Sequence, residues 1–111
     1  MRRSIAAGRP VEMKEVGLFA DGVAVKRVGD KCFELCRECL DDIILVDTDA
    51  ICGAIKDIFE DARVVAEPAG ALSLAGLKAY AEANDLHDKT LCAIVSGANM
   101  NFDRLGYVAD R

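Results

Sequence analysis

The chain has 111 residues, of which 52% are hydrophobic and 30% are charged, and its formal net charge at pH 7 is −5. That length and apolar content suit one domain, or part of one, with a real hydrophobic core. An acidic chain lacks the basic face that nucleic acid and anionic membranes require, so we expect neither as a partner. No apolar run reaches the length of a membrane span. The stretch MRRSIAAGRP has no apolar h-region, so we expect it not to be a secretory signal. Five cysteines, an odd count, argue against a closed disulfide framework, so we expect a reducing cytoplasm.

The first half of the chain predicts two helices. Residues 1–7 are typical of the tail of a helix, which Gly8 and Pro10 would end. Asp30 is expected to cap a second helix that runs to about Leu40. Apolar side chains recur there at helical spacing, namely Phe33, Cys36 and Leu40, with Cys32, Leu35 and Cys39 beside them.

The second half predicts two strands and three helices. The apolar runs at residues 43–46 and 91–95 indicate buried strands. Between them, Asp47 or Thr48 would cap a helix to about Asp61, and Pro68 would begin a helix that ends near Ala83. The expected inner face of the first of these helices is Ile51, Ile55, Ile58 and Phe59. A final helix is expected at residues 105–111.

The order strand, helix, helix, strand predicts an α/β fold with a parallel sheet. Parallel sheets need helices on both faces, so we expect a partial three-layer arrangement. Two parallel strands make a poor independent domain. We therefore expect residues 1–111 to be part of a larger α/β domain.

Neither the cysteines nor the histidine indicates a metal site or a catalytic residue. Cys32, Cys36 and Cys39 share one helical face, whereas a zinc site needs four tetrahedral ligands that usually come from turns. We expect these cysteines to be small core residues. His87 is the only histidine and lies in a polar stretch, so we expect it to be exposed to solvent and no histidine-based triad to form.

The stretch LCAIVSGAN, residues 91–99, places polar side chains directly after a predicted strand. In open parallel sheets, ligands bind beyond the carboxyl ends of the strands. Ser96 offers a hydroxyl that can donate or accept, and Gly97 permits close approach of a backbone or a flat ring. Asn99 adds an amide, or forms an Asx turn. The alternative is an ordinary polar turn.

Glu67 stands immediately before the predicted helix that Pro68 begins. A carboxylate there complements the positive end of the helix dipole, which is a purely structural role. The small residues that follow, in EPAGA, would also leave room for a ligand beside the carboxylate. Both interpretations stay open on this segment alone.

Four segments together carry a resemblance to a known family. They are GLFADGVAVKRVGD (residues 17–30), LDDIILVDTDAI (40–51), VAEPAGALSLAGLKAY (65–80) and IVSGANMNF (94–102). In this order, and over nearly the whole chain, the sequence resembles the biosynthetic threonine dehydratases and, more weakly, the serine racemases and dehydratases. The resemblance implies a tryptophan-synthase-β-like (fold type II) domain with pyridoxal 5'-phosphate as cofactor. It also implies a homo-oligomeric lyase that converts threonine, with serine as an alternative substrate, to a 2-oxo acid and ammonia on the route to isoleucine.

The resemblance assigns expected cofactor-binding roles to five residues. It implies that Ser96 hydrogen-bonds the pyridine nitrogen, and that Gly97 and Asn99 shape the loop around the ring. Glu67 would line the site, and the Gly22 backbone would approach the cofactor. A neutral hydroxyl does not hold a proton on the ring nitrogen as a carboxylate would, so it favours loss of the β-hydroxyl over transamination.

Other parts of the family pattern have no match in this sequence. The Schiff-base lysine segment, the glycine-rich phosphate loop and the isoleucine-binding regulatory domain are not found. The resemblance therefore predicts that residues 1–111 are the C-terminal portion of a catalytic domain, with the missing part of that domain as partner. Alone, the chain is expected to be inactive, because covalent catalysis needs the lysine. We also expect it to expose an apolar face along residues 68–83 and 91–95.

A non-enzymatic reading competes with this one. The chain would then be a truncated α/β module that pairs with a full-length subunit, or binds a small anion at the helix after Glu67. An α/β domain without any ligand is the third possibility.

Overall fold

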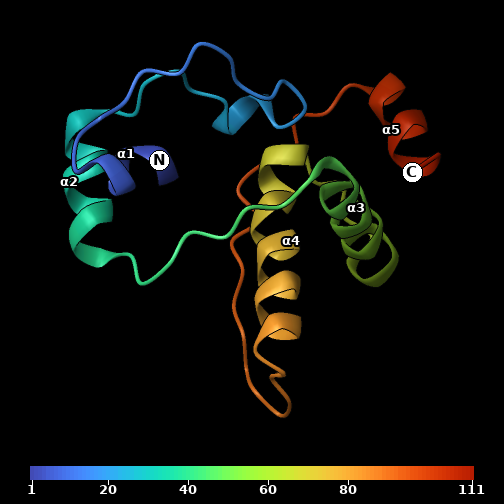
Figure 1. Ribbon diagram of the computed structural model, residues 1–111. Coiled ribbons are helices and arrows are strands. Elements are labelled where there is room, and N and C mark those ends of the chain that lie inside the picture. The colour runs from blue at the N-terminus through green and yellow to red at the C-terminus, as the bar shows by residue number, and fades with distance from the viewer. The chain divides into compact units, whose positions relative to one another are not determined.

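The computed structural model describes residues 1–111 and contains helices but no strand. Its elements are α1 (Arg2–Ala7), the 3₁₀ turn η1 (Asp21–Val23), α2 (Asp30–Cys39), α3 (Thr48–Ala62), α4 (Pro68–Ala83) and α5 (Phe102–Ala109) (Figure 1). None of these helices combines the length and the apolar content needed to cross a bilayer. The chain forms two compact units. The first comprises Met1–Leu18 and Val23–Ile43, and the second comprises Phe19–Gly22 and Ile44–Arg111.

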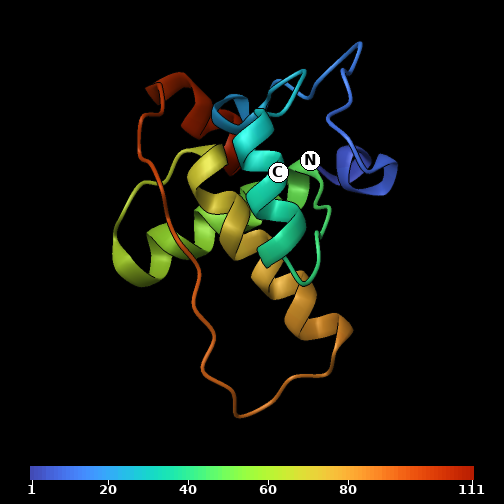
Figure 2. The ribbon, with the colours of Figure 1, turned by 90° about the vertical axis from the view of Figure 1, so that its left-hand side faces the viewer.

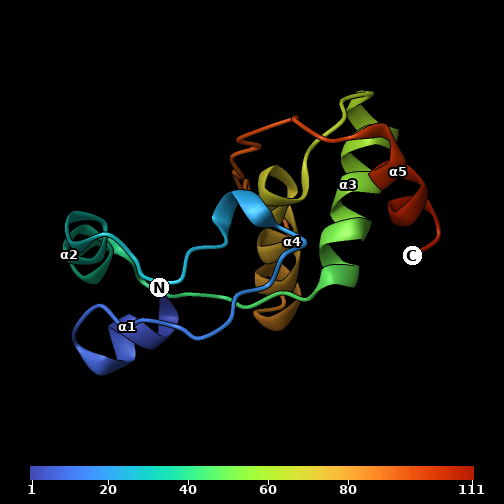
Figure 3. The ribbon, with the colours of Figure 1, turned by 90° about the horizontal axis from the view of Figure 1, so that it is seen from above.

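In the second unit, α3 packs against both α4 and α5 (Figure 3). The buried side chains are mostly aliphatic or small: Ile51, Cys52, Ala54, Ile55 and Ile58 of α3, with Ala66, Ala71, Ala75 and Val108. Small side chains at these positions allow the helices to pack closely. Burial raises the pKa of the Cys52 thiol, which therefore stays neutral in the core.

The prediction for α3 is confirmed in its bounds and mostly in its buried face. Asp47 Oδ1 accepts a hydrogen bond from the Ala50 N–H at 2.8 Å and caps the helix. The helix ends at Ala62, and its C-cap residue Arg63 has a left-handed φ of 56°. Phe59 was wrongly predicted as a core residue, since it is 47% exposed. It lies beside a surface hollow between α3 and α5, outside the stripe that the neighbouring helices cover.

Helix α4 also matches its prediction. Glu67 is its N-cap residue and Pro68 occupies its first turn. Its N-terminal half is the more buried, through Pro68, Ala69, Gly70, Ala71 and Ala75. An ion pair between Lys78 of α4 and Asp57 of α3 joins the two helices further along.

The first unit is built on α1 and α2, which contact each other. Gly8 ends α1 with a left-handed φ of 66°, as the sequence predicts. Asp30 is not the cap of α2, because Gly29 is the N-cap residue and the Asp30 carboxylate pairs with Arg27 at 2.6 Å. Phe33 is the buried residue of α2, whereas Leu40 is exposed.

The two predicted strands do not form within residues 1–111. Residues 43–46 and 91–95 carry no strand assignment, and no backbone hydrogen bond joins them. After α4 the chain turns back and runs along that helix (Figures 1 and 2). The Ser73 hydroxyl of α4 donates to the Ile94 carbonyl at 2.6 Å, in place of a strand partner. A strand exists only through pairing with a neighbour, so the predicted parallel sheet is absent here although the helices are confirmed.

The final helix begins earlier than predicted. Helix α5 starts at Phe102 rather than near Leu105, and ends at Ala109. Phe102 is almost fully exposed, so the first turn of α5 forms without burying its aromatic side chain.

Candidate functional site

Glu67 joins the first turn of α4 to the loop at residues 96–99 through two hydrogen bonds. The Glu67 N–H donates to the Gly97 carbonyl at 3.0 Å. The Glu67 carboxylate accepts, through Oε2, a hydrogen bond from the Asn99 N–H at 3.1 Å. One residue thus holds the loop by both its main chain and its side chain.

Two glycines allow this loop to lie directly on the helix. A β-carbon at Gly97 would be 2.5 Å from Glu67 Oε1 and 2.7 Å from Glu67 Cδ. A β-carbon at Gly70 would be 2.5 Å from the Gly97 carbonyl oxygen and 2.9 Å from the Gly97 nitrogen. These separations are shorter than van der Waals contact, so only glycine fits at either position without a shift of its neighbours.

Gly22 reaches the same place from a distant part of the sequence. A β-carbon at Gly22 would be 2.9 Å from Ala69 Cβ and 3.4 Å from Glu67 Oε1. The structure therefore brings four of the five predicted site residues together around the carboxylate: Gly22, Glu67, Gly97 and Asn99.

Ser96, the fifth predicted residue, precedes Gly97 in the same loop and is exposed. Its hydroxyl has no hydrogen-bond partner in the protein, and neither does the Asn99 amide group, which is also exposed. Asn99 uses its main-chain N–H to bind Glu67, and its side chain forms no Asx turn of the kind considered from the sequence. Both polar side chains are free to meet a ligand.

The Glu67 carboxylate serves as a link and not as a helix cap. It makes no capping hydrogen bond to α4, although it lies at the positive end of that helix. It is half-buried, and its oxygens face Asn99, Gly97 and Gly22. An anion brought to this helix start would meet a negative charge already in place, which disfavours the anion-binding alternative.

Ser73 belongs to this site and was not predicted from the sequence. Its bond to the Ile94 carbonyl fixes the extended segment that leads into residues 96–99. The available signal was a lone serine in the otherwise apolar and small-residue stretch AGALSLAG. A helical serine can also bond to a carbonyl one turn earlier, as Ser73 does to Gly70 at 3.5 Å, so the sequence alone did not reveal the partner at Ile94.

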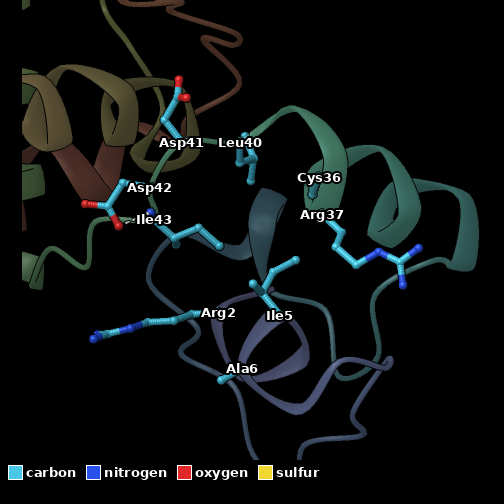
Figure 4. A pocket seen from close by; sticks show the side chains of 9 residues that line it. All are labelled: Arg2, Ile5, Ala6, Cys36, Arg37, Leu40, Asp41, Asp42 and Ile43. Carbon is cyan, nitrogen blue, oxygen red and sulfur yellow. Dashed lines mark hydrogen bonds between the residues drawn. The ribbon is translucent and has the colours of Figure 1, made fainter.

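The first unit holds a separate cavity of about 250 Å³ between α1 and α2 (Figure 4). It is lined by none of the predicted site residues. Arg2 and Arg37 extend away from each other in Figure 4, and Asp42 is already bonded to the Ile43 N–H at 2.7 Å. These charged groups do not converge on one point, so the cavity lacks the arrangement of a ligand site.

The remaining candidates from the sequence lie apart from Glu67. Cys32 and Cys39 are exposed and Cys36 is half-buried, so the prediction that all three are core residues is wrong. Phe33 is the buried residue of α2, and the cysteines lie outside its buried position. His87 is exposed, as predicted, and pairs with Asp85 at 2.9 Å. The structure has no group of three or more His, Cys, Asp or Glu side chains that could hold a metal ion.

Comparison with known proteins identifies the family. Residues 1–97 match the family of pyridoxal-phosphate dependent enzymes, and the chain belongs to that family. It is 59% identical over 111 residues to a biosynthetic L-threonine dehydratase from Burkholderia multivorans. The alignment covers all of this chain and 22% of that protein. The chain thus spans about a fifth of the length of the curated relatives it matches.

Solved structures agree with this assignment. The processed form of threonine deaminase isoform 2 from Solanum lycopersicum superimposes with a TM-score of 0.94 at 41% identity, over 97% of this chain and 32% of that one. Maize serine racemase gives a TM-score of 0.79 at 31% identity, over 97% of this chain and 35% of that one. The resemblance to threonine dehydratases is confirmed, and the fold is that of a fragment of a fold type II enzyme.

Proposed function

We propose that residues 1–111 form the C-terminal portion of the catalytic domain of a biosynthetic threonine dehydratase. The complete enzyme would be a cytoplasmic homo-oligomer that converts L-threonine to 2-oxobutanoate and ammonia for isoleucine synthesis. The observation that carries this proposal is the Ser96 hydroxyl, which is exposed and unpartnered in a loop that Glu67 holds on α4. The similarity to threonine dehydratases along the whole chain supports the choice of substrate.

The residues around Glu67 fit pyridoxal 5'-phosphate. The exposed Ser96 hydroxyl and Asn99 amide have no partner in the protein and can meet the polar atoms of its ring. The absence of a β-carbon at Gly97 and Gly22 lets Glu67 and Ala69 lie against their main chain, so the backbone beside Ser96 is held in place. Ser96 would face the ring nitrogen with its hydroxyl. Asn99 would flank the ring with its free amide, while its N–H stays with Glu67.

Pyridoxal phosphate, when bound, supplies an electron sink for the negative charge that develops on the substrate α-carbon. Ser96 would set the strength of that sink, because a neutral hydroxyl does not stabilise an added proton on the ring nitrogen as a carboxylate does. A weaker sink favours departure of the β-hydroxyl. Glu67 would act on this chemistry only by holding the loop that carries Ser96.

We also propose that residues 43–46 and 91–95 are strands of a parallel sheet in the complete domain. Both segments flank α4, where Ile44 and Ile94 line the same shallow hollow. Leu45 is 66% exposed and Ile94 is 71% exposed, although both residues are apolar. Neighbouring strands would pair the free main-chain groups and cover these side chains.

The experiment is a graft in which this chain replaces the matching segment of the Burkholderia multivorans enzyme. We expect the graft to produce 2-oxobutanoate from threonine. We expect Ser96→Ala to reduce kcat by about tenfold to a hundredfold, the effect of losing one strong hydrogen bond. Ser96→Thr keeps the hydroxyl and is the matched control, so it should retain most of the activity. Thermal unfolding of each variant reports whether the fold is intact.

Two results would contradict the proposal. One is a folded graft that neither binds pyridoxal phosphate nor deaminates threonine. The other is a Ser96→Ala graft with the activity and cofactor absorbance spectrum of the unsubstituted graft. The alternative, a non-enzymatic module that pairs with a full-length subunit, gains support if the isolated chain co-purifies with such a subunit while the graft is inactive.

A further inference from the structure

The segment Phe19–Gly22 is anchored to α5. The Arg104 guanidinium donates, through Nη1, to the Phe19 carbonyl at 3.3 Å, and the same nitrogen lies 3.8 Å from Asp21 Oδ1. The rings of Phe19 and Tyr107 are 5.5 Å apart between centroids. Phe19 and Ala20 also pack against the core of the second unit.

Of the two Arg104 contacts, the one to the carbonyl is the stronger. The ion pair is long, and its side chains are 38% and 71% exposed, so water screens it. The hydrogen bond to Phe19 is shorter, at 3.3 Å, is partly buried and has a charged donor, so water screens it less than the ion pair. We therefore attribute the anchoring mainly to the carbonyl contact.

The other end of the same segment is Gly22, at the candidate site. Gly22 packs so closely on Ala69 and Glu67 that no β-carbon fits there. Only two residues separate it from Phe19, and they lead into the tight turn η1. A displacement of Phe19 is therefore passed to Gly22 with little loss, and active sites are sensitive to shifts of about 1 Å.

We propose that Arg104 is a positioning residue for the cofactor. It holds the Phe19 carbonyl, and thereby keeps the Gly22 backbone against the Glu67 side of the site. No hydrogen bond or ion pair joins Arg104 to any of the five predicted site residues, and it lies beyond residues 1–97, the part that matches the family model. This inference rests on the proposed function, since it concerns the same site.

The test compares three substitutions in the graft. We expect Arg104→Met to raise the dissociation constant for pyridoxal phosphate about tenfold, which is the loss of one charge-assisted hydrogen bond. Arg104→Lys retains a charged donor and should restore most of the affinity. Arg27→Met is the control, because Arg27 pairs with Asp30 at 2.6 Å within the first unit, whereas Arg111 stacks on the Tyr107 ring that packs against Phe19. Arg27→Met should leave cofactor affinity unchanged whatever its effect on the melting temperature.

The dissociation constant would be measured by spectroscopic titration of cofactor-free protein, with melting temperatures recorded alongside. Arg104→Met with unchanged affinity would overturn the inference, and so would equal losses in Arg104→Met and Arg27→Met. If Arg104→Met does not fold, Arg104→Gln, which removes the charge but keeps a polar side chain, decides in its place: lower affinity than Arg104→Lys supports the role, and affinity equal to that of the unsubstituted graft refutes it. An active graft with insensitive Arg104 variants leaves the proposed function standing, whereas an unsubstituted graft that binds no cofactor removes both.

Discussion

Glu67 is the residue on which the candidate site depends. Its main chain begins α4, its N–H binds the Gly97 carbonyl, and its carboxylate binds the Asn99 N–H. The two interpretations that the sequence left open, helix dipole and ligand site, are therefore not exclusive. The carboxylate lies at the positive end of a helix and at the same time shapes the loop that carries Ser96.

The close contact between Gly70 and Gly97 yields a prediction about substitution. Gly70→Ala would drive a β-carbon into the Gly97 main chain, which cannot rotate away as a side chain can. We expect it to lower the free energy of unfolding of the graft by about 1–3 kcal/mol and to weaken cofactor binding. Gly53 of α3 is the matched control, because a β-carbon there meets nothing within 4 Å. Gly53→Ala should stabilise by about 0.5–1 kcal/mol.

Urea denaturation and cofactor titration of both glycine variants provide the measurements. A Gly70→Ala protein as stable as the unsubstituted graft would show that the loop can lift from the helix at little cost.

Part of the site could be predicted from the sequence because it is local. Ser96, Gly97 and Asn99 are consecutive or nearly so, and polar residues after an apolar run are visible in the sequence. The link from Glu67 to Asn99 joins separate segments, and no spacing rule reveals it. Arg104 gave no signal at all, because its role depends on which carbonyl the fold brings within its reach.

At the level of elements, helices α3 and α4 were predictable because their signals are local. An aspartate caps one and a proline starts the other. The strands failed for the opposite reason. An apolar β-branched run favours extended backbone, but a strand also needs hydrogen-bonding partners from another segment. No backbone hydrogen bond joins residues 43–46 to residues 91–95.

Ser73 tests how the extended segment is held. Ser73→Ala removes the hydroxyl that binds the Ile94 carbonyl. We expect faster amide hydrogen exchange in residues 91–97 of the graft, and a loss of about 1 kcal/mol in the free energy of unfolding. Ser4→Ala is the control, since the buried Ser4 hydroxyl accepts from Val11 in the first unit. Unchanged exchange at residues 91–97 would mean that this hydrogen bond does not hold the segment.

At the level of the whole molecule, large apolar side chains are exposed. Phe102 is 84% exposed, and Leu45 and Ile94 are exposed nearly as much. We expect the isolated chain to associate and to bind apolar dyes, because water-exposed apolar surface favours self-association. Ile94→Lys should reduce both effects. Light scattering coupled to size-exclusion chromatography would check this, and a monodisperse monomer with a cooperative melt and no dye binding would contradict it.

The contact of Gly70 with Gly97 has a consequence for how such an enzyme could change its preference. Where main chain rests on main chain, the height of the loop above the helix is set by backbone atoms that every variant shares. No substitution at Gly70 or Gly97 can adjust that height by small increments, since even a single β-carbon at either position collides with its neighbours. In the enzyme proposed above, selection for a different amino acid substrate would therefore have to act on residues other than Gly70 and Gly97.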